Sequence, residues 1–430
     1  MIILLCWQKK ENIMELTIHR GTNEVGGSCV EITSNTTRIL IDMGLPLDPV
    51  GSFAGKTMPV QAGGKGLPPS LNFRHRKIDA VLISHPHQDH FGLLPMLPAG
   101  VPIYMSKGCE KLIGIATFFN QVGPVQNRIV PLKSWEKIDI GNISITPYLA
   151  DHSAIDAFSF LIESEQKHIF YTGDLRAHGR KKILFDTLLL HPPDNIDYLI
   201  LEGTMLGRAG ELCMEEAELE EELVRLFKGG QELFLVNCSS QNIDRLVSLF
   251  RACVRSGRQL VIDPYTAYIL AEIHKVHATV PNWDWNNVRV FFTPNSHTNL
   301  LAKDKTLYKF IPAKITIEEI QKERQGLVFK MNRMNRNILK NKMMLPGAQL
   351  IWSVWNEYYN AEEAFWKTQN ITPIFLHTSG HAHSEDLQRL VKALKPGAII
   401  PIHTFHKMQY QSMFPENNIC MLEDGKGITI

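Results

Sequence analysis

Four residues able to bind a metal ion stand within six positions of the chain, in the run SHPHQDHFG. They are His85, His87, Asp89 and His90. Imidazole nitrogens and carboxylate oxygens are ligands that zinc prefers in proteins. The run follows the apolar stretch DAVLI, so we expect a turn at the carboxyl end of a strand, where α/β proteins expose their ligands. Alternate positions in such a turn allow the first two histidines to serve one metal and the Asp-His pair its neighbour.

Three isolated residues elsewhere complete a set large enough for two metals. His152 in ADHS, Asp174 in YTGD and His403 in PIHTFH each follow an apolar, β-type run. Each taken alone is better explained as a polar residue at a strand end, but together with the cluster they supply the further ligands that a catalytic zinc site needs. Two adjacent divalent ions lower the pKa of bound water and stabilise charge on the attacking and leaving oxygens. The set therefore predicts hydrolysis, that of phosphodiesters included.

The elements that must position these residues fall into three parts. From Met14 to about Ile162, short β-type runs alternate with turns and helical segments, which predicts a mixed α/β domain. A Gly- and Pro-rich stretch within it, residues 45–76, is expected to be a long loop. After YLILEGT the pattern becomes that of a second, inserted α/β unit, and the last part must rejoin the first domain because His403 needs partners there. The expected ranges are 14–205 and 371–430 for the first domain and 206–370 for the insert.

The overall composition is that of a globular protein without an electrostatic signature. Of 430 residues, 44% are apolar and 21% are charged, and the formal net charge is +1. Bulk charge therefore neither supports nor excludes nucleic acid as a partner. The most basic window, residues 303–342, has eleven lysines or arginines against four acids. It fits a solvated helical face as well as it fits a nucleic-acid contact.

Cysteine use and the first residues favour a reducing, cytoplasmic location. Seven cysteines are scattered without C-x-x-C pairs, an odd number that does not suit a disulfide framework. The opening MIILLCW is too short for a membrane span and runs into QKKEN without a cleavage site. Met14 is an equally good start, since residues 1–13 add nothing to the strand pattern that begins there.

The order of the ligands, H-x-H-x-D-H and then a separated His, Asp and His, resembles that of the metallo-β-lactamase superfamily. The resemblance implies an αββα sandwich with two metal ions and a bridging hydroxide; zinc is the expected metal and manganese the alternative. Asp174 is implied as the carboxylate that spans both ions, and Asp42, at the end of ILID, as a brace for the metal-binding loop. By motif, the two metals are held by two triads: His85, His87 and His152 for one, and Asp89, His90 and His403 for the other.

Four further motifs narrow the resemblance to the β-CASP branch, which processes nucleic acids: GTNEVGGSC, LEGT, CSSQNIDR and HTSGHAH. The chain most resembles bacterial ribonuclease J and its archaeal relatives, in which an α/β β-CASP domain interrupts the metallo-β-lactamase domain and substrate runs through the cleft between them. Glu202 in LEGT then matches the branch's acidic motif, and His381 in SGHA matches the histidine at the scissile phosphate or leaving group. A neighbouring carboxylate keeps such an imidazole charged for proton donation. The implied catalytic residues are Asp89, Glu202 and His381.

Two loops are implied as contacts for the phosphates of the substrate. The first lies between a strand and a helix, where amides and hydroxyls can cradle a phosphate; plain capping of the helix IDRLVSLFRACV explains it equally well. The second precedes His381. Aromatic residues of the insert are expected mainly in the core, with stacking on bases as the alternative, and His383 and His406 have no matched role. The expected substrate-binding residues are Ser239, Ser240, Gln241, Asn242 and Arg245 in the first loop and His377, Thr378, Ser379 and Gly380 in the second.

The function expected is a metal-dependent ribonuclease acting on single-stranded RNA, with 5′ exonuclease action as one form and DNA as an alternative substrate. A homo-oligomer fits this expectation and a membrane partner does not. The chain has PIHTFH where ribonuclease J has His followed by Gly and Glu, and it lacks that family's extra C-terminal domain, so oligomer contacts and processivity are not carried over. Two alternatives stay open: a hydrolase of small esters, lactones or thioesters, which the insert disfavours, and an inactive nucleic-acid-binding module, which the complete ligand set disfavours.

Overall fold

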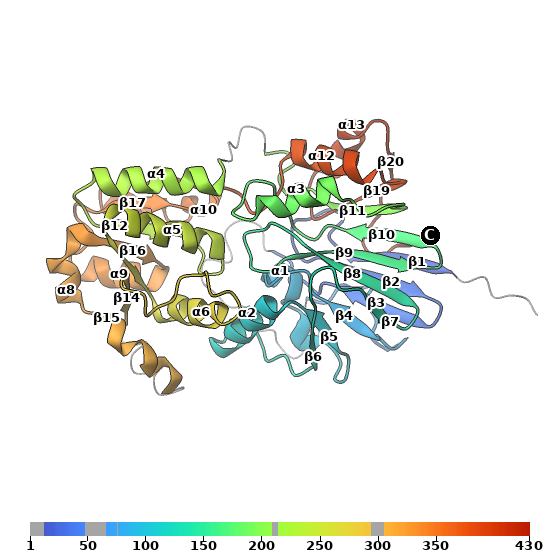
Figure 1. Ribbon diagram of the computed structural model, residues 1–430, viewed down its shortest axis with the longest axis horizontal. Helices are drawn as coiled ribbons and strands as arrows, with labels where there is room; N and C mark the ends of the chain where they lie inside the picture. Colours follow the sequence, from blue (N-terminus) through green and yellow to red (C-terminus); the bar gives the residue numbers. More distant parts are fainter. Residues whose placement is uncertain (1–12, 48–65, 75, 209–213, 294–304) are drawn as a thin grey trace, which may run out of the picture.

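The computed structural model describes residues 13–47, 66–74, 76–208, 214–293 and 305–430. Within these ranges three sheets of seven strands each form two bodies that lie side by side (Figure 1). The opening MIILLCW, Cys6, Cys213 and much of the stretch expected as a long loop lie outside the described residues. In the part that is described, the helices are too short or too polar to cross a membrane.

The first sheet is built from the N-terminal strands and is closed at one edge by the last strand of the chain. Its order is β21-β1-β2-β3-β4-β5-β6. Strands β1 to β3 and β21 pair antiparallel, whereas β3 to β6 pair parallel. The strands are β1 (Met14–Arg20), β2 (Cys29–Ser34), β3 (Thr37–Ile41), β4 (Ala80–Leu82), β5 (Ile103–Met105), β6 (Ile129–Pro131) and β21 (Gly427–Thr429).

The second sheet joins strands from before and after the insert. Its order is β20-β19-β11-β10-β9-β8-β7, and β19, which follows the insert, pairs parallel with β11, which precedes it. The last part of the chain therefore rejoins the first domain. The strands are β7 (Ile138–Ile140), β8 (Ile143–Leu149), β9 (Phe158–Ser164), β10 (Lys167–Tyr171), β11 (Tyr198–Glu202), β19 (Ala398–Ile402) and β20 (Asn418–Ile419).

These two sheets pack face to face because each turns a row of apolar side chains toward the other. Leu16 and Ile18 of β1 are fully buried in one core cluster with Phe160 of β9 and Ile400 of β19. Further clusters bury the outer faces under helices, which gives four layers in the order helix, sheet, sheet, helix. The expected αββα sandwich is thus confirmed. Its helices are α1 (Gln88–Phe91), η1 (Leu94–Met96) and α2 (Lys107–Phe118) on the first sheet and α3 (Lys182–Leu190), α12 (Ser384–Leu394) and α13 (Gln409–Met413) on the second.

The insert is a parallel sheet with helices on both faces, drawn in yellow to orange in Figure 1. Its order is β15-β14-β13-β16-β12-β17-β18, from β12 (Phe234–Asn237), β13 (Gln259–Ile262), β14 (Val288–Phe291), β15 (Lys314–Ile315), β16 (Leu327–Met331), β17 (Gln349–Trp352) and β18 (Ile374–Phe375). Strands covered on both faces are apolar almost throughout, as β16 is. One face packs against α4 (Glu216–Gly229), α5 (Ile243–Ser256), α6 (Pro264–His274) and η2 (Lys305–Ala313). The other packs against α8 (Ile317–Lys322), η3 (Arg324–Gly326), α9 (Arg333–Asn341), α10 (Glu357–Asn360) and α11 (Glu363–Thr368).

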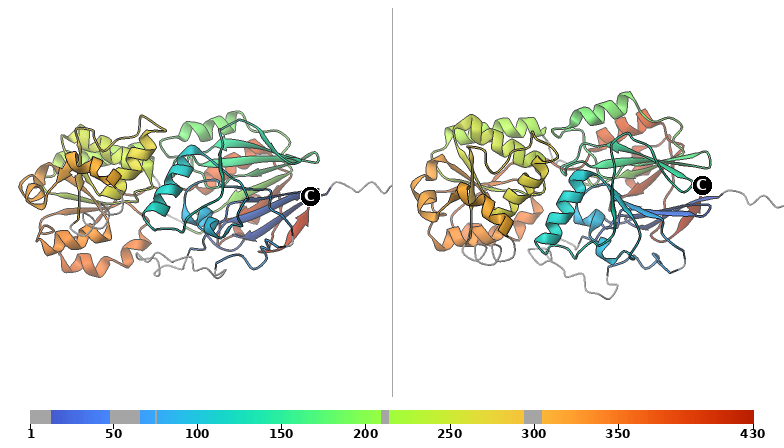
Figure 2. Two further views of the ribbon diagram at one scale, coloured as in Figure 1. Left: turned by 90° about the horizontal axis from the view of Figure 1, so that it is seen from below. Right: turned by 60° about the horizontal axis from the view of Figure 1, so that its bottom comes forward.

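The two bodies meet along a seam that α2 and α6 form on one side (Figure 2). Aromatic rings fill it: Phe118 stacks on Tyr268 with ring centroids 5.3 Å apart, and Phe119 meets Tyr265 edge to face at 4.9 Å. Strand β18 pairs with β17 at the edge of the insert's sheet, and Leu376 N after it still donates to the carbonyl of Trp352 at 2.9 Å. The chain therefore leaves the insert only a few residues before His381.

Candidate metal centre and substrate cleft

The run SHPHQDH forms a tight turn between β4 and the one-turn helix α1, as its position after an apolar strand predicts. Backbone bonds fix this turn against the loop after β3: Met43 N donates to the carbonyl of His90 at 2.7 Å, and Ser28 N to that of Asp89 at 3.1 Å. A Cβ at Gly44 would lie 1.7 Å from the Asp89 carbonyl oxygen, so only glycine allows this close approach.

Three imidazoles converge at one side of the turn. His85 Nε2 lies 3.1 Å from His87 Nδ1, and His152 Nε2, from the loop after β8, lies 3.2 Å from the same atom. Nitrogen ligands about 2.0–2.1 Å from a tetrahedral zinc lie about 3.3 Å from one another. Both of these distances are close to that spacing, and all three nitrogens lie within 4.8 Å of one another.

A second triad lies beside the first, and the carboxylate of a seventh residue lies close to both. His403 Nε2 is 3.3 Å from Asp89 Oδ2, and His90 Nε2 is 4.0 Å from that same oxygen. Asp174, after β10, reaches both groups, because its Oδ2 lies 3.2 Å from His90 Nε2 and 3.6 Å from His85 Nε2. The structure therefore brings all seven expected ligands into one place, as the two triads and the spanning carboxylate that the resemblance implies.

Protonation and burial of the first triad suit a divalent cation. Burial lowers the pKa of His85 and His152 well below the ordinary histidine value and that of His87 to about 4, so these rings offer lone pairs at neutral pH. Against burial, His403 and His90 lower the pKa of Asp89 to about 2. His90 Nε2 and Asp174 Oδ1 are buried without a hydrogen-bond partner, a costly arrangement that coordination relieves. The donor set fits two metal ions with nitrogen and oxygen ligands.

Asp42 anchors the turn from below, at the end of β3. It is fully buried with φ 60°, and its carboxylate accepts hydrogen bonds from Ser84 N, Ser84 Oγ and Tyr171 OH at 2.7–2.8 Å. It also accepts from His90 Nδ1 at 2.8 Å. Such a bond fixes the ring so that the other nitrogen faces the metal position. This geometry matches the bracing role implied for Asp42.

The rings of His152 and His403 are oriented in the same way. A residue that follows the insert orients His152, and a residue that precedes it orients His403. His152 Nδ1 donates to the carbonyl of Gly380 at 2.5 Å. His403 Nδ1 faces Thr204 Oγ1 at 2.8 Å, and Thr204 Oγ1 donates to Glu202 Oε2 at 2.7 Å. In both rings Nε2 is the nitrogen that faces the other ligands.

Glu202 and His381 form a pair next to the metal cluster. His381 Nδ1 lies 3.3 Å from Glu202 Oε1 and 3.7 Å from Asp174 Oδ2. Burial alone would lower the pKa of His381, but these two carboxylates outweigh it and raise the pKa above the ordinary histidine value. Glu202 is itself fixed by the backbone amides of Leu175 and Thr204, both at 3.1 Å. The arrangement holds a charged imidazole at the edge of the site.

The first expected phosphate loop is only partly turned toward the site. Asn242 caps α5 by accepting from Arg245 N at 2.9 Å, as the capping alternative predicts. Ser239 and Asn242 line the cavity above the metal cluster. Ser240 instead bonds Thr266 at 2.9 Å, and Gln241 bonds Tyr265 at 3.0 Å.

Arg245 lies deeper than the rest of that loop. Its side chain is fully buried and pairs with Glu216 at 2.8 Å, and it also donates to the carbonyl of Ser353 at 3.1 Å. Its guanidinium thus faces the interior of the insert rather than the cavity.

The second expected loop lies directly over the first metal triad. His377, Ser379 and Gly380 line the cavity, while Thr378 is turned away and donates to the carbonyl of Met214 at 2.6 Å. A Cβ at Gly380 would lie 2.9 Å from Ser153 Oγ and 3.1 Å from His152 Cε1, so the loop packs tightly against the metal-binding segment. Burial lowers the pKa of His377 to about 3, so this ring is neutral.

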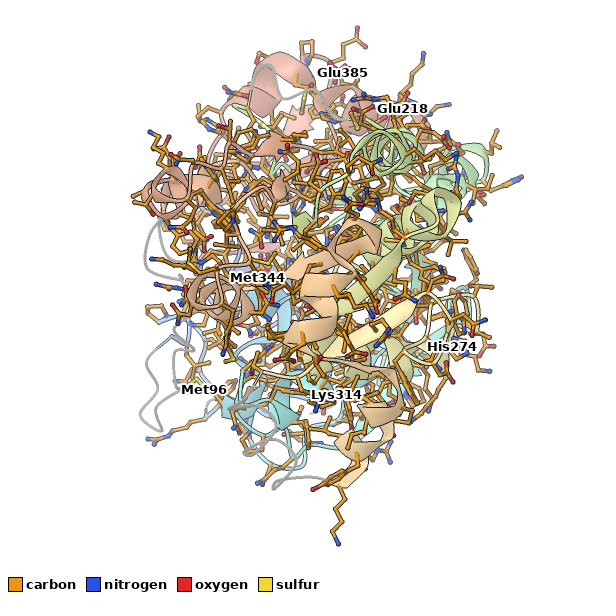
Figure 3. The ribbon with its side chains drawn as sticks, turned by 90° about the vertical axis from the view of Figure 1, so that its left-hand side faces the viewer. Met96, Glu218, His274, Lys314, Met344 and Glu385 are labelled. Atoms are coloured by element: carbon orange, nitrogen blue, oxygen red, sulfur yellow. The ribbon has the colours of Figure 1, made fainter. Side chains whose placement is uncertain are left out.

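Between the two bodies lies a cavity of about 840 Å³ whose floor includes His87, Asp89 and His403. It is lined from the sandwich by residues such as Phe405 and from the insert by residues such as Trp355. The basic window at residues 303–342 does not take part: none of its described lysines or arginines lines this cavity. Figure 3 looks onto the insert and labels one of them, the exposed Lys314.

Arg176 is a structural residue that sequence reasoning missed. It is fully buried two positions after Asp174, and it pairs with Asp151 at 3.3 Å and with Asp244 of α5. It also donates to the carbonyl of Ser379 at 2.9 Å. One guanidinium therefore ties the segments of His152, Asp174 and His381 to the insert. The sequence shows only that an arginine follows Asp174 in YTGDLR. The partners of this arginine are remote in the chain.

Two family models match the chain. Residues 37–221 match the beta-lactamase superfamily domain, and residues 374–411 match the Zn-dependent metallo-hydrolase RNA specificity domain. The first range includes the turn, His152 and Asp174; the second includes His381 and His403. Together with the αββα sandwich and the converging ligands, these matches identify a domain of the metallo-β-lactamase superfamily in the chain.

The relatives specify the branch. Ribonuclease J of Helicobacter pylori strain B128 is 24% identical over 454 residues, 97% of this chain and 60% of that protein. The RNase J-like protein of Methanocaldococcus jannaschii is 24% identical over 421 residues, 93% of each chain. A crystal structure of a protein of unknown function from Enterococcus faecalis V583 has the same fold, with a TM-score of 0.76 and 21% identity over 97% of this chain and 100% of that one. The chain resembles the ribonuclease J-like nucleases of the β-CASP branch; it spans about 60% of the length of the Helicobacter relatives.

Proposed function

We propose that this protein is a metal-dependent ribonuclease that hydrolyses phosphodiester bonds of single-stranded RNA. The observation that carries the proposal is the convergence of two ligand triads and a spanning carboxylate on the floor of a cavity between the sandwich and a β-CASP insert. Zinc suits these nitrogen and oxygen ligands, and manganese is the alternative. Relatives that align with 93–97% of this chain are named ribonuclease J or RNase J-like protein, which favours RNA over DNA as the substrate.

The chain's own residues supply orientation and a proton. When bound, two divalent ions supply an activated water and neutralise charge on the phosphate. His381, kept charged by Glu202 and Asp174, is placed to donate a proton to the departing ribose oxygen. Glu202 also acts through Thr204 to orient His403, so one carboxylate serves both the acid and a metal ligand.

Recognition of the RNA 5′ end belongs to the same proposal. Ser239, Asn242 and His377 line the cavity from the insert and from the loop before His381, and they offer hydroxyl, amide and ring groups to phosphate oxygens. A terminal phosphate held there would set the first linkage over the metal centre, which gives 5′ exonuclease action. We place the protein in the cytoplasm, because the five described cysteines are unpaired.

The test is a cleavage assay with the zinc- or manganese-loaded protein. RNA labelled at its 3′ end and carrying a 5′-monophosphate, the same RNA with a 5′-hydroxyl, and the matching DNA are compared. We expect metal-dependent cleavage of the RNA, fastest with the monophosphate, and mononucleotides as the first products. Asp89→Ala is the control and should be inactive. If parent and control leave the RNA equally intact, the nuclease proposal fails.

A further inference from the structure

Three aromatic side chains line the cavity, and two of them have large parts of their rings uncovered. Phe405 is 67% exposed and Tyr358 is 51% exposed, whereas Trp355 is half-buried. Trp352 also lines the cavity, but like Trp366 it is at most 2% exposed. The expectation that the insert's aromatics lie mainly in the core therefore describes Trp352 and Trp366, but not Tyr358.

Phe405 is carried on a short, well-supported segment directly after the metal ligand His403. His406 N donates to Thr404 Oγ1 at 3.0 Å, and Gln409 N donates to the carbonyl of His406 at 2.9 Å. The His406 ring packs on Gly207, where φ is 79° and a Cβ would lie 2.3 Å from Nε2. Hydrogen bonds and the packing of His406 thus fix the backbone next to Phe405, and the ring extends from this fixed segment.

From the insert, Trp355 and Tyr358 present a matching apolar surface. They meet edge to face with centroids 5.5 Å apart, and the guanidinium of Arg208 lies over the Trp355 ring at 4.3 Å. Arg208 comes from the sandwich, directly after Gly207, so this cation–π contact links the insert's aromatic pair to the segment on which Phe405 is supported. Indole, phenol and guanidinium planes are all surfaces on which a nucleobase stacks.

Charged side chains of both signs lie beside the aromatic rings. Glu357 and Glu362 line the cavity, and so does Arg208, which lies over the Trp355 ring. The metal ligands and the polar residues Ser239 and Asn242 line the same cavity and suit phosphate oxygens. The aromatic rings instead offer uncharged faces on which a base can stack. A nucleotide whose phosphate lies over the metals therefore has aromatic rings within the same cavity for its base.

We propose that Phe405, Trp355 and Tyr358 form a nucleobase subsite that holds one unpaired base of a nucleotide flanking the scissile phosphate. This inference rests on the proposed function, because it requires that the cavity bind nucleic acid. It adds to that function by naming the residues that select single strands. A base in a duplex is stacked on both faces, so it cannot stack on these rings. Stacking is tolerant of sequence, so the subsite accepts any of the four bases.

The first experiment detects stacking without requiring cleavage. Short single-stranded RNAs carry 2-aminopurine at successive positions from the 5′ end, and its fluorescence is followed by stopped flow with the full, zinc-loaded chain. We expect rapid quenching at one position, before any product forms. In Phe405→Ala and Trp355→Ala the affinity should fall about 5- to 150-fold, the range for loss of one base–aromatic stack. Trp135→Ala is the matched control, since Trp135 is 52% exposed and does not line the cavity.

The second experiment changes the RNA and so does not depend on the folding of a variant. Abasic sites are placed at the same positions, and binding and cleavage are measured with the unchanged protein. We expect the loss of binding and cleavage to be greatest when the abasic site is at the quenched position. The Phe405→Ala variant should bind this abasic RNA almost as well as it binds intact RNA. Quenching without cleavage would reject the nuclease and keep the subsite. Cleavage with no quenching at any position, or equal quenching in the parent and both cavity variants, would overturn the subsite.

Discussion

Replacing Arg176 by methionine removes a buried guanidinium that joins the metal-binding segments to the insert. The cluster around it holds three cations, Arg176, Arg245 and Lys181, against three carboxylates, Asp151, Asp244 and Glu216. Methionine keeps an unbranched apolar stem and leaves a buried excess of one negative charge. Breaking a buried pair in this way costs about 3–5 kcal/mol.

The loss falls mainly on Asp151. Glu216 keeps Arg245 at 2.8 Å and Asp244 keeps Lys181 at 2.9 Å, whereas Asp151 is left with Lys181 at 3.9 Å. Burial already raises the pKa of Asp151 although Arg176 and Lys181 oppose it, and the substitution removes the stronger opposition. A carboxyl group whose pKa is raised by folding stabilises the fold below that pKa and loses the contribution as pH rises. The deficit of the variant should therefore be smaller at pH 5 than at pH 8.

Urea unfolding of the parent and Arg176→Met at both pH values measures this effect. At pH 8 we expect the midpoint to fall by roughly 1–2 M, taking about 3 kcal/mol per molar for the dependence on urea. Arg389→Met is the control: Arg389 is 50% exposed and pairs with Asp386 at 2.8 Å and Asp186 at 3.3 Å, so its loss should cost less than about 1 kcal/mol. Equal shifts for the two variants, or a larger deficit at pH 5, would refute the reasoning.

Further predictions follow from single groups. Arg245 and Arg176 outweigh burial and lower the pKa of Glu216 to about 2. Ionised Glu216 therefore contributes about 3 kcal/mol to the free energy of unfolding above pH 4.5, and this contribution is lost as pH falls toward 2. In unfolding measured against pH, Glu216→Gln should not show this loss. Asp42→Asn should weaken metal binding about 10- to 100-fold in a chelator competition, because it loses the bond to His90; unchanged affinity would contradict the bracing role. Gly380→Ala should lower RNA cleavage at least about tenfold with unaltered metal content, because the added methyl group displaces the loop over the site.

The ligand cluster could be located from sequence because one short turn carries four of its members. Strand periodicity identified DAVLI as a buried strand, and the ends of other apolar runs supplied His152, Asp174 and His403. The structure brings these side chains together through β19, which pairs with β11 across the whole insert. The mixed α/β class and the inserted unit followed from the same patterns, whereas the αββα sandwich was implied by the family resemblance.

Partners that pair across domains were beyond sequence reasoning. Arg245 follows a helix cap, a position typical of a ligand contact, and only the packing of α4 against α5 shows that Glu216 neutralises it in the interior. Phe405 and Trp355 are 50 positions apart and share no periodic pattern, so nothing in the sequence indicates that they line one cavity. Burial of a charge and convergence of distant rings are properties of tertiary packing.

The order of the strands has a consequence for synthesis of the chain on the ribosome. The first triad, His85, His87 and His152, is complete before the insert is made, but His403 lies on the far side of it, at the end of β19. A nascent polypeptide that ends within the insert contains the residues of the first triad but lacks both His381 and His403. The second triad is thus incomplete until β19 has been synthesised, so its assembly comes after that of the first.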